Sequence, residues 1–248
     1  MQKVSNLMNN IDPVTGRRRE IQKLINIIPK SLRLRFNPRR YAIENFVHEK
    51  SLYIKKGSIV LDAGAGPCPY KSMFNHCKYE ATDFVENGIV DFICSLEKIP
   101  RRSNTYDVVL LTEVLEHVED PIKVLKEVRR VLKEKGQLLI TVPQAWMVHQ
   151  KPHNYFYFTN YGLELILKKS GFRKFVVRPM GGYFWFLADV IRFNSILDQL
   201  GKYKIIYYPL KIIEYPITKI IVPLILFYLD FLDSKKDWTM GYTAEAIK

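Results

Sequence analysis

The sequence has few cysteines, no apolar leader and no long uninterrupted apolar run. Its three cysteines, Cys68, Cys77 and Cys94, form no Cys-x-x-Cys pair and match no metal-ligand spacing, which predicts reduced thiols and no bound metal. The first residues, Met-Gln-Lys-Val-Ser-Asn, lack the apolar core of a signal peptide. No uninterrupted run reaches the roughly eighteen apolar residues that cross a bilayer. We therefore expect a cytoplasmic protein without a membrane-spanning helix.

Acidic residues are also scarce, and the excess of basic charge is uneven. The chain has 38 Lys and Arg against 25 Asp and Glu, a net charge of +13, and residues 1–40 contribute +8 of it. We interpret 1–40 as a basic N-terminal extension that is attracted to an anionic partner such as lipid head groups, RNA or a sugar nucleotide. The alternative is a solvated extension that only aids solubility. An apolar patch beside the arginines favours a surface; it consists of Ile21, Leu24, Ile25, Ile27 and Ile28.

Residues 41–179 alternate between predicted strands and helices. A helix is expected over 40–54, with Ala42, Phe46 and Leu52 turned inward, and a strand, a glycine loop and a helix over 58–76. Further strands are expected up to residue 83 and over 89–93, 106–112, 137–142 and 172–177, with helices over 120–135 and 159–169. This alternation predicts an α/β fold with a doubly wound, mostly parallel sheet.

The loop after the first strand carries the most informative residues. Ile59, Val60 and Leu61 lead into Asp62, and the turn contains Gly64 and Gly66, which let the backbone approach a bound molecule closely. A helix after this turn would direct its free N–H groups at that molecule. Asp83 ends the next strand, about twenty residues on, where a carboxylate accepts hydrogen bonds from a ribose. The pattern predicts a nucleoside-containing cofactor.

The same loop is unsuited to a pyrophosphate. Pro67 and Pro69 flank Cys68, so the turn loses two N–H donors, and Pro69 stands where a dinucleotide loop has its third glycine. The acid before the glycines, Asp62, suits a cationic ligand. A dehydrogenase is therefore disfavoured.

The loop resembles motif I of the class I S-adenosylmethionine-dependent methyltransferases, which is close to Leu-Asp-x-Gly-x-Gly-x-Gly. The resemblance continues through 106–117, Tyr-Asp-Val-Val-Leu-Leu-Thr-Glu-Val-Leu-Glu-His, and through 136–143, Gly-Gln-Leu-Leu-Ile-Thr-Val-Pro. It covers roughly residues 40–180. It implies a seven-stranded Rossmann-like sheet whose last strand, within residues 239–248, is reversed, and S-adenosyl-L-methionine as the cofactor.

The resemblance also implies which residues contact the cofactor. Gly64 and Gly66 would pass under its methionine part, Asp62 would hold its amino group through water, and Asp83 would bind the ribose. Ser95 stands where an aspartate that contacts adenine is usual, and Cys68 replaces the third glycine. The implied cofactor-binding set is Asp62, Ala63, Gly64, Gly66, Asp83, Ser95, Leu96, Thr112 and Glu113.

Three histidines are candidate general bases. His117 follows the fourth strand, and its ordinary pKa near neutrality suits proton transfer; it could equally bond a backbone carbonyl. His149 and His153 lie after the fifth strand, on the loop expected to cover the acceptor, and either could instead only fix that loop. We rank His153 first. The run 153–159 resembles a family stretch that commonly carries an arginine near Tyr157, and this chain lacks it.

An apolar insertion over 180–238 separates the sheet from its last strand. Pro209, Pro216 and Pro223 recur seven residues apart, which predicts short helices broken at the prolines. Residues 220–229 are apolar on every side and, being too short to span a bilayer, could lie in a membrane interface. A buried subdomain or the interface of a homodimer would produce the same composition.

Together these features favour a methyltransferase that resembles the small-molecule enzymes of ubiquinone and surface-glycan pathways. The expected acceptor is a hydroxyl of a sugar, glycolipid or other lipid-linked molecule, met at the inner face of an anionic membrane by a peripheral protein. One alternative is an RNA methyltransferase steered by the basic extension, although nucleic acid is the less favoured partner. Another is a non-catalytic binding protein of the same fold.

Overall fold

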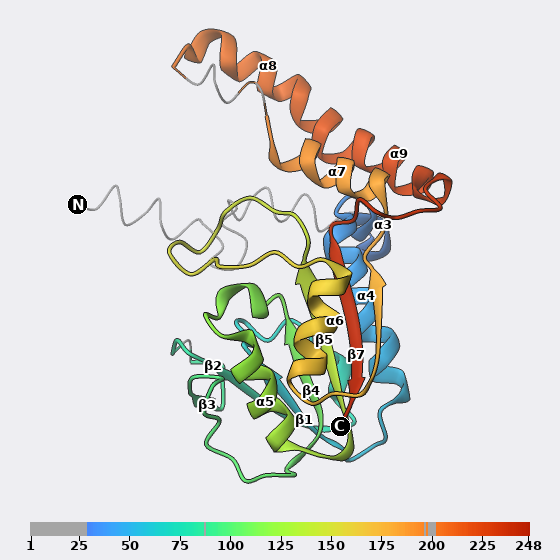
Figure 1. Ribbon diagram of the computed structural model, residues 1–248. Coiled ribbons are helices and arrows are strands. Elements are labelled where there is room, and N and C mark those ends of the chain that lie inside the picture. The colour runs from blue at the N-terminus through green and yellow to red at the C-terminus, as the bar shows by residue number, and fades with distance from the viewer. Residues whose placement is uncertain (1–28, 87, 196, 198–201) are drawn as a thin grey trace, which may run out of the picture.

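The computed structural model describes residues 29–86, 88–195, 197 and 202–248. Its centre is a seven-stranded sheet with the strand order β3-β2-β1-β4-β5-β7-β6 (Figure 1). The strands are β1 (Ile59–Ala63), β2 (Lys78–Asp83), β3 (Phe92–Ile93), β4 (Tyr106–Thr112), β5 (Leu132–Pro143), β6 (Lys174–Pro179) and β7 (Gly241–Ile247). The strands from β3 to β5 are parallel, whereas β7 is antiparallel to both β5 and β6. The predicted doubly wound sheet with a reversed last strand is confirmed.

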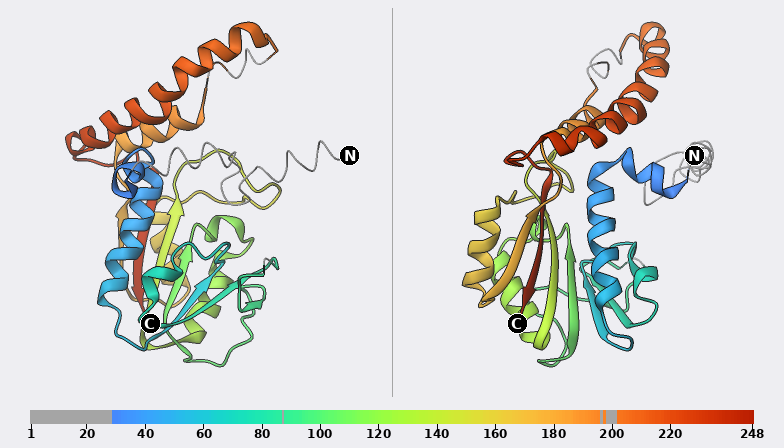
Figure 2. Two further views of the ribbon diagram at one scale, coloured as in Figure 1. Left: turned by 180° about the vertical axis from the view of Figure 1, so that it is seen from behind. Right: turned by 90° about the vertical axis from the view of Figure 1, so that its right-hand side faces the viewer.

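Helices cover both faces of the sheet, as Figure 2 shows. On one face α4 (Pro38–Tyr53), preceded by α3 (Lys30–Arg35), places Val47 in one buried cluster with Leu110 of β4. On the other face α5 (Pro121–Val131) and α6 (Asn160–Lys169) pack Leu125 and Leu163 in one cluster with Leu111. Leu110 and Leu111 are adjacent residues on opposite faces of one strand, which explains the continuous apolar run of β4.

The helices α4, α5 and α6 each begin directly after a capping residue, although the predicted start of α4 was residue 40 rather than Pro38. The side chain of Asn37 caps α4, and that of Asp120 caps α5; each accepts a hydrogen bond from the backbone N–H three residues on, and a proline follows each cap. The hydroxyl of Thr159 caps α6 in the same way, at 3.0 Å. The predicted extent of α6 is confirmed.

Several predicted boundaries are wrong. The helix expected to reach residue 135 ends at Val131, because Leu132 is fully buried and already pairs with Tyr106 as the first residue of β5. Leu52, expected to turn inward, is 68 % exposed, and the buried face of α4 contains Ile43 and Val47. Strand β3 is limited to Phe92–Ile93, and β6 begins two residues later than expected.

The prediction of a helix directly after the glycine loop is also wrong. Only one turn of 3-10 helix, η1 (Lys71–Phe74), forms there. Pro67 and Pro69 cannot donate backbone hydrogen bonds, and Cys68 between them has φ of +52°. The N-terminus of a helix therefore does not face the glycine loop, and any ligand there must be held by side chains and by the loop itself.

The insertion folds as helices between β6 and β7. It begins with α7 (Tyr183–Phe193). A second helical segment runs without a break through α8 (Lys204–Pro216), the π-helical η4 (Ile217–Ile221), α9 (Val222–Leu229) and the 3-10 turn η5 (Asp230–Leu232) (Figure 1). The predicted break at each proline is wrong. Pro223 has no N–H to donate to the carbonyl of Lys219, and Nη1 of Arg192 in α7 donates to this carbonyl instead, at 3.0 Å. The π-helical turn η4 directly precedes α9 and lets the helix continue past the proline.

The apolar part of this continuous helix is longer than the sequence pattern suggested. Residues Tyr207–Leu232, 26 in all, form a helix long and apolar enough to cross a membrane. The expectation that no such helix exists was based on uninterrupted apolar runs, which Lys211, Glu214 and Lys219 interrupt. A helix tolerates such isolated charges, because their long side chains can extend along its surface.

The basic extension lies mostly outside the described residues. This holds for the apolar patch of residues 21–28 and for the basic residues before Lys30. The boundary predicted between 40 and 41 falls inside α4, which begins at Pro38. Arg39 and Arg40 are therefore part of the folded chain, where Arg40 pairs with Glu44 of α4 and Arg39 pairs with Asp189 of α7 in the insertion.

Candidate active site

Gly64 begins the turn after β1 and has no room for a side chain. Its φ is +78°, and a Cβ there would lie 2.6 Å from Cγ2 of Val114. Gly66 also has a positive φ, +50°, but no described atom lies within 4 Å of the position its Cβ would take. Gly64 is thus required by packing within the fold, whereas Gly66 faces open space that a ligand can fill.

Asp83 ends β2 and holds the glycine loop in place. Its Oδ2 accepts a hydrogen bond from the N–H of Gly66 at 2.9 Å, and its Oδ1 accepts from Phe84 at 2.7 Å and from Val85 at 3.3 Å. A carboxylate has roughly four acceptor positions, so Asp83 retains capacity for about one further hydrogen bond. Phe84 is 68 % exposed beside it and offers an apolar face to a nucleobase.

A cavity of 770 Å³ opens at the carboxyl ends of the parallel strands. Its volume lies within the range of small-molecule sites, about 300–1,000 Å³. Most of the predicted site residues line it, namely Gly64, Gly66, Asp83, Ser95, Leu96, Glu113, His117 and His153. Four carboxylates, those of Asp83, Glu97, Glu113 and Glu119, are among its lining groups. This acidic lining suits a cationic sulfonium or ammonium ligand better than a phosphate.

Four predicted site residues, Asp62, Ala63, Thr112 and His149, are not among those that line the cavity. Asp62 is fully buried, and its Oδ2 accepts a hydrogen bond from the hydroxyl of Tyr79. Its Oδ1 has no hydrogen-bond partner within the described part of the chain. Burial raises the pKa of Asp62 to about 6, although the Tyr79 hydrogen bond lowers it. Asp62 therefore does not face the cavity directly, and the water-mediated contact implied by the resemblance stays a prediction.

Two of the histidines are held by backbone carbonyls. Nδ1 of His117 lies 2.5 Å from the carbonyl oxygen of His153, and Nδ1 of His149 lies 3.1 Å from that of Met147. A carbonyl only accepts, so Nδ1 of each ring is the donor, and in the neutral form of the ring Nε2 carries the lone pair. Burial lowers the pKa of His117. In its neutral form, a ring held in this way can accept a proton or bind a metal at Nε2.

His153 is oriented by a hydroxyl rather than by a carbonyl. Its Nδ1 lies 3.0 Å from the hydroxyl of Tyr155, and that hydroxyl donates to Oε1 of Glu119 at 3.2 Å. Since the Tyr155 proton is directed to Glu119, the hydroxyl oxygen accepts from Nδ1 of His153. This relay leaves Nε2 of His153 able to accept a proton, and His153 lines the cavity.

Glu116 lies next to His117 in η2 (Leu115–His117) and is fully buried. Burial and the nearby charge of Glu113 raise the pKa of Glu116 to about 9. Although the cysteine spacing predicted no metal site, the fold brings possible ligand atoms of Glu116, His117 and His149 within 4.8 Å of one another. His149 comes from the loop after β5, so its distance along the chain concealed this grouping.

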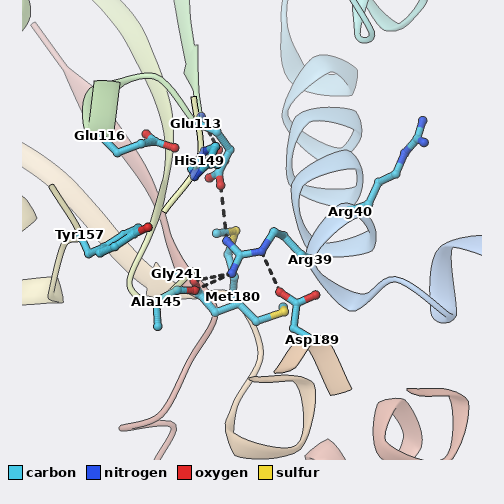
Figure 3. Close-up of polar contacts among 12 residues, drawn as sticks. Arg39, Arg40, Glu113, Glu116, Ala145, His149, Tyr157, Met180, Asp189 and Gly241 are labelled. Atoms are coloured by element: carbon cyan, nitrogen blue, oxygen red, sulfur yellow. Dashed lines mark hydrogen bonds and ion pairs between the residues drawn. The ribbon is translucent and has the colours of Figure 1, made fainter. Parts of the chain in front are cut away.

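Arg39 joins the insertion to the wall of the cavity, and no sequence motif predicted this role. Its Nε donates to Oδ2 of Asp189 in α7 at 2.8 Å, its Nη1 lies 3.5 Å from Oε2 of Glu113, and its Nη2 donates to the carbonyl of Ala145 at 2.9 Å (Figure 3). The guanidinium also stacks 4.3 Å from the ring centre of Trp146. The Asn37-Pro38 helix start could have assigned Arg39 to the folded domain instead of to the extension.

Other residues that line the cavity were also missed. Phe84 follows the strand-end acid directly, and its position could have identified it. Glu119 lies just before the Asp120 cap of α5. Gln150 and Lys151 come from the loop after β5, whose path no periodicity predicts.

Comparisons with known proteins agree with this geometry. Residues 35–175, more than half of the chain, match a family described as a methyltransferase domain. No curated protein sequence matches the chain significantly. A solved S-adenosylmethionine-dependent methyltransferase from Archaeoglobus fulgidus is 15% identical with a TM-score of 0.52, over 83% of this chain and 93% of that one.

Two other solved structures are similar. The [4+2]-cyclase SpnF is 16% identical, with a TM-score of 0.53 over 83% of this chain and 79% of that one. Phosphoethanolamine N-methyltransferase 2 from Haemonchus contortus, solved with phosphomonomethylethanolamine and S-adenosylhomocysteine, is 16% identical, with a TM-score of 0.51; 83% of this chain aligns with 52% of that one.

Likeness at these identities shows the fold alone, and the family match shows more. It agrees with the glycine loop, the strand-end acid and the acidic cavity at the carboxyl edge of the sheet. The chain therefore belongs to the methyltransferase domain family and is a class I methyltransferase that uses S-adenosylmethionine.

Proposed function

We propose that this methyltransferase works at a membrane surface and methylates a hydroxyl of a sugar, glycolipid or other lipid-linked small molecule. The observation that carries the proposal is the exposed apolar helix over residues 207–232, of whose most apolar window only 6 % is buried. Its exposed side chains include Ile212 at 75 %, Ile213 at 61 % and Phe231 at 78 %. An apolar surface of this extent marks a site of membrane or protein interaction.

The connectivity of the insertion favours a helix that lies in the membrane surface over one that crosses it. Pro179 at the end of β6 pairs with Tyr242 of β7, so the insertion leaves and re-enters the sheet at one place. The end of the long helix is also fixed to the start of the insertion, because Oδ1 of Asp230 accepts a hydrogen bond from the N–H of Gly182 at 3.0 Å. A single crossing would leave these neighbouring points on opposite sides of a bilayer. An interfacial helix, with its lysines reaching the head groups, avoids this conflict.

The location of the insertion supports an acceptor delivered from the membrane. Helices α7, α8 and α9 lie beyond the carboxyl ends of the parallel strands, the edge at which the cavity opens (Figures 1 and 2). The contacts of Arg39 with Asp189 and Glu113 connect α7 to the cavity wall. A membrane-bound acceptor would therefore approach the cavity from the side on which the helix is held.

The chain supplies alignment and a base. The cofactor carries an activated methyl group on a sulfonium sulfur. Asp83 and the glycine loop would hold its nucleoside, and Phe84 would pack against the nucleobase. Apolar walls at Leu96 and Val114 would keep water from the methyl group. Nε2 of His153 would take the proton of the acceptor hydroxyl as the oxygen attacks.

Flotation with liposomes tests the membrane part of the proposal. The purified protein is mixed with neutral or anionic vesicles at low and high salt. We expect flotation that survives high salt, and loss of flotation in the double variant Ile212→Asp with Ile213→Asp, because burying each isoleucine contributes about 1.5–3 kcal/mol. Leu165→Asp on α6, where Leu165 is 51 % exposed, is the matched control and should float. A wild-type protein that never floats would refute membrane binding, and sedimentation would then test a homodimer.

Transfer of a tritiated methyl group from the cofactor tests the acceptor. We expect the label in membrane lipid extracts rather than in soluble metabolites. We also expect the label to resist mild alkali, because a methyl ether survives conditions that hydrolyse a methyl ester. His153→Gln should reduce the rate without changing cofactor affinity. Label in RNA would support the alternative that depends on the basic extension, and absence of label in the lipid extracts would refute the proposed lipid-linked acceptor.

A further inference from the structure

A buried acid and two histidines meet beside the cavity. Possible ligand atoms of Glu116, His117 and His149 lie within 4.8 Å of one another, and Nε2 of His117 lies 3.8 Å from Oε1 of Glu116. Glu116 is 0 % exposed, and neither of its carboxylate oxygens has a hydrogen-bond partner among the described residues. A buried carboxylate normally has its oxygens satisfied, so this pair of oxygens requires an explanation.

The two imidazoles are arranged as metal ligands are. In each ring Nδ1 donates to a backbone carbonyl, that of His153 for His117 and that of Met147 for His149. Such a bond fixes the tautomer and leaves the Nε2 lone pair for a metal, which is the usual outer arrangement around a histidine ligand. The ring centres are 4.8 Å apart and the rings are nearly perpendicular.

A second acid, Glu113, is an electrostatic neighbour of Glu116. Oε1 of Glu113 is buried and has no hydrogen-bond partner within the described ranges, and its Oε2 lies 3.5 Å from Nη1 of Arg39. Figure 3 shows the side chains of Glu113, Glu116 and His149 gathered in one region. Both His117 and Glu113 line the cavity, so open coordination positions of an ion held there would face the acceptor.

We propose that Glu116, His117 and His149 bind a divalent transition-metal ion, with Glu113 as a further carboxylate neighbour. Two imidazoles and a carboxylate suit Zn²⁺, Fe²⁺ or Mn²⁺ better than Mg²⁺ or Ca²⁺, which favour oxygen ligands alone. Ligands about 2.1 Å from a tetrahedral ion lie about 3.4 Å apart. The most widely separated of these atoms therefore need to approach by about 1.4 Å on binding.

The role of this ion rests on the proposed function. An acceptor hydroxyl on the ion becomes more acidic and would lose its proton to Nε2 of His153. The oxygen then forms a bond with the methyl carbon as the methyl–sulfur bond breaks, and the sulfur keeps the electron pair as a neutral thioether. His117 and His149 would thus be ligands, and His153 alone would remain as the base.

Metal binding is tested without reference to activity. Untagged protein is stripped with EDTA and titrated calorimetrically with Zn²⁺, Mn²⁺ or Mg²⁺, and Co²⁺ loading is followed by its visible absorption. We expect one saturable site for Zn²⁺, weak or no binding of Mg²⁺, and at least tenfold weaker Zn²⁺ binding in His149→Ala and Glu116→Gln. His48→Ala, which alters an exposed residue of α4, is the matched control and should bind as the wild type does.

Two further measurements separate the possible failures. Unchanged cofactor affinity in His149→Ala and Glu116→Gln shows that these variants fold. The proposal is overturned if the protein has no stoichiometric Zn²⁺ site, or if both variants bind Zn²⁺ with the affinity of the wild type. If Zn²⁺ binds but its removal leaves methyl transfer unchanged, the catalytic role is overturned. If Zn²⁺ binds and no acceptor is ever methylated, the proposed function fails while the metal site is supported.

Discussion

The buried ion pair between Arg39 and Asp189 gives a prediction that can be worked out in magnitude. The side chains are 11% and 3% exposed, the N–O distance is 2.8 Å, and Oδ1 of Asp189 has no other partner among the described residues. In Arg39→Met the buried Asp189 charge would lose its hydrogen-bonded partner and keep only the longer-range attraction of Arg192, which costs about 3–5 kcal/mol. The carbonyls of Ala145 and Met240 would each lose a donor, at about 1 kcal/mol each.

The expected loss for Arg39→Met is therefore on the order of 5 kcal/mol, a large part of the roughly 5–15 kcal/mol that stabilises a domain. For a chain of this size it corresponds to a fall of about 10–20 °C in Tm. Adding Asp189→Leu removes the second charge, and the double variant should recover most of the loss, since an apolar pair of similar volume replaces a buried ion pair at little cost.

Urea unfolding followed by circular dichroism at pH 7 measures the four members of this double-mutant cycle. Burial raises the pKa of Asp189, and Arg39 lowers it. Without Arg39 the carboxyl protonates more readily, so the loss in Arg39→Met should shrink as the pH falls. The reasoning would be refuted if Arg39→Met cost less than about 1 kcal/mol, or if the two substitutions were simply additive.

Three other substitutions test the loop, a buried acid and the insertion. Gly64→Ala should lower the free energy of unfolding by about 2–5 kcal/mol, because Gly64 has a positive φ and a Cβ there would clash with Val114. Gly66→Ala should lower it by only about 1–2 kcal/mol but weaken cofactor binding in calorimetry. Equal losses of stability in the two variants would contradict the assignment of Gly64 to packing and of Gly66 to the ligand. Asp62 has a folded pKa of about 6 against an ordinary value of 3.8, so its stabilising contribution is complete below pH 3.8 and is lost as the pH rises through 6. Asp62→Asn should therefore stabilise the protein by about 3 kcal/mol at pH 7 and by less than about 1 kcal/mol at pH 4, and a gain independent of pH in urea unfolding would exclude this cause. Arg192→Met removes donors to two backbone carbonyls at 2.6 and 3.0 Å, which costs about 1–3 kcal/mol and should speed proteolysis within residues 207–232; an unchanged cleavage rate would mean that Arg192 does not hold the helix.

The sequence determined the features that depend on local chemistry. Alternating apolar segments and capping residues such as Asp120 and Thr159 predicted the sheet, its helices and most of their starting points. The glycines, Asp83 and the motif order predicted the family and the cofactor. These signals are readable because strand burial, turn geometry and helix caps each depend on a few neighbouring residues.

Boundaries set by packing were less readable. The helix α5 stops at Val131 because Leu132 is drawn into the sheet, and the prolines of the insertion are tolerated because Arg192 satisfies a carbonyl from another helix. Both outcomes depend on residues that are distant along the chain or on the space left between layers, and neither is encoded in a short window.

The composition of the active site was decided by the tertiary structure. The sequence by itself assigned the fold and the cofactor. Only the folded chain brings Arg39 from α4 against Asp189 of α7 and Glu113 after β4. Only the fold joins His149 to Glu116 and His117. The reason is that parallel strands gather their carboxyl ends at one edge of the sheet, so residues from separate loops become neighbours there regardless of their spacing.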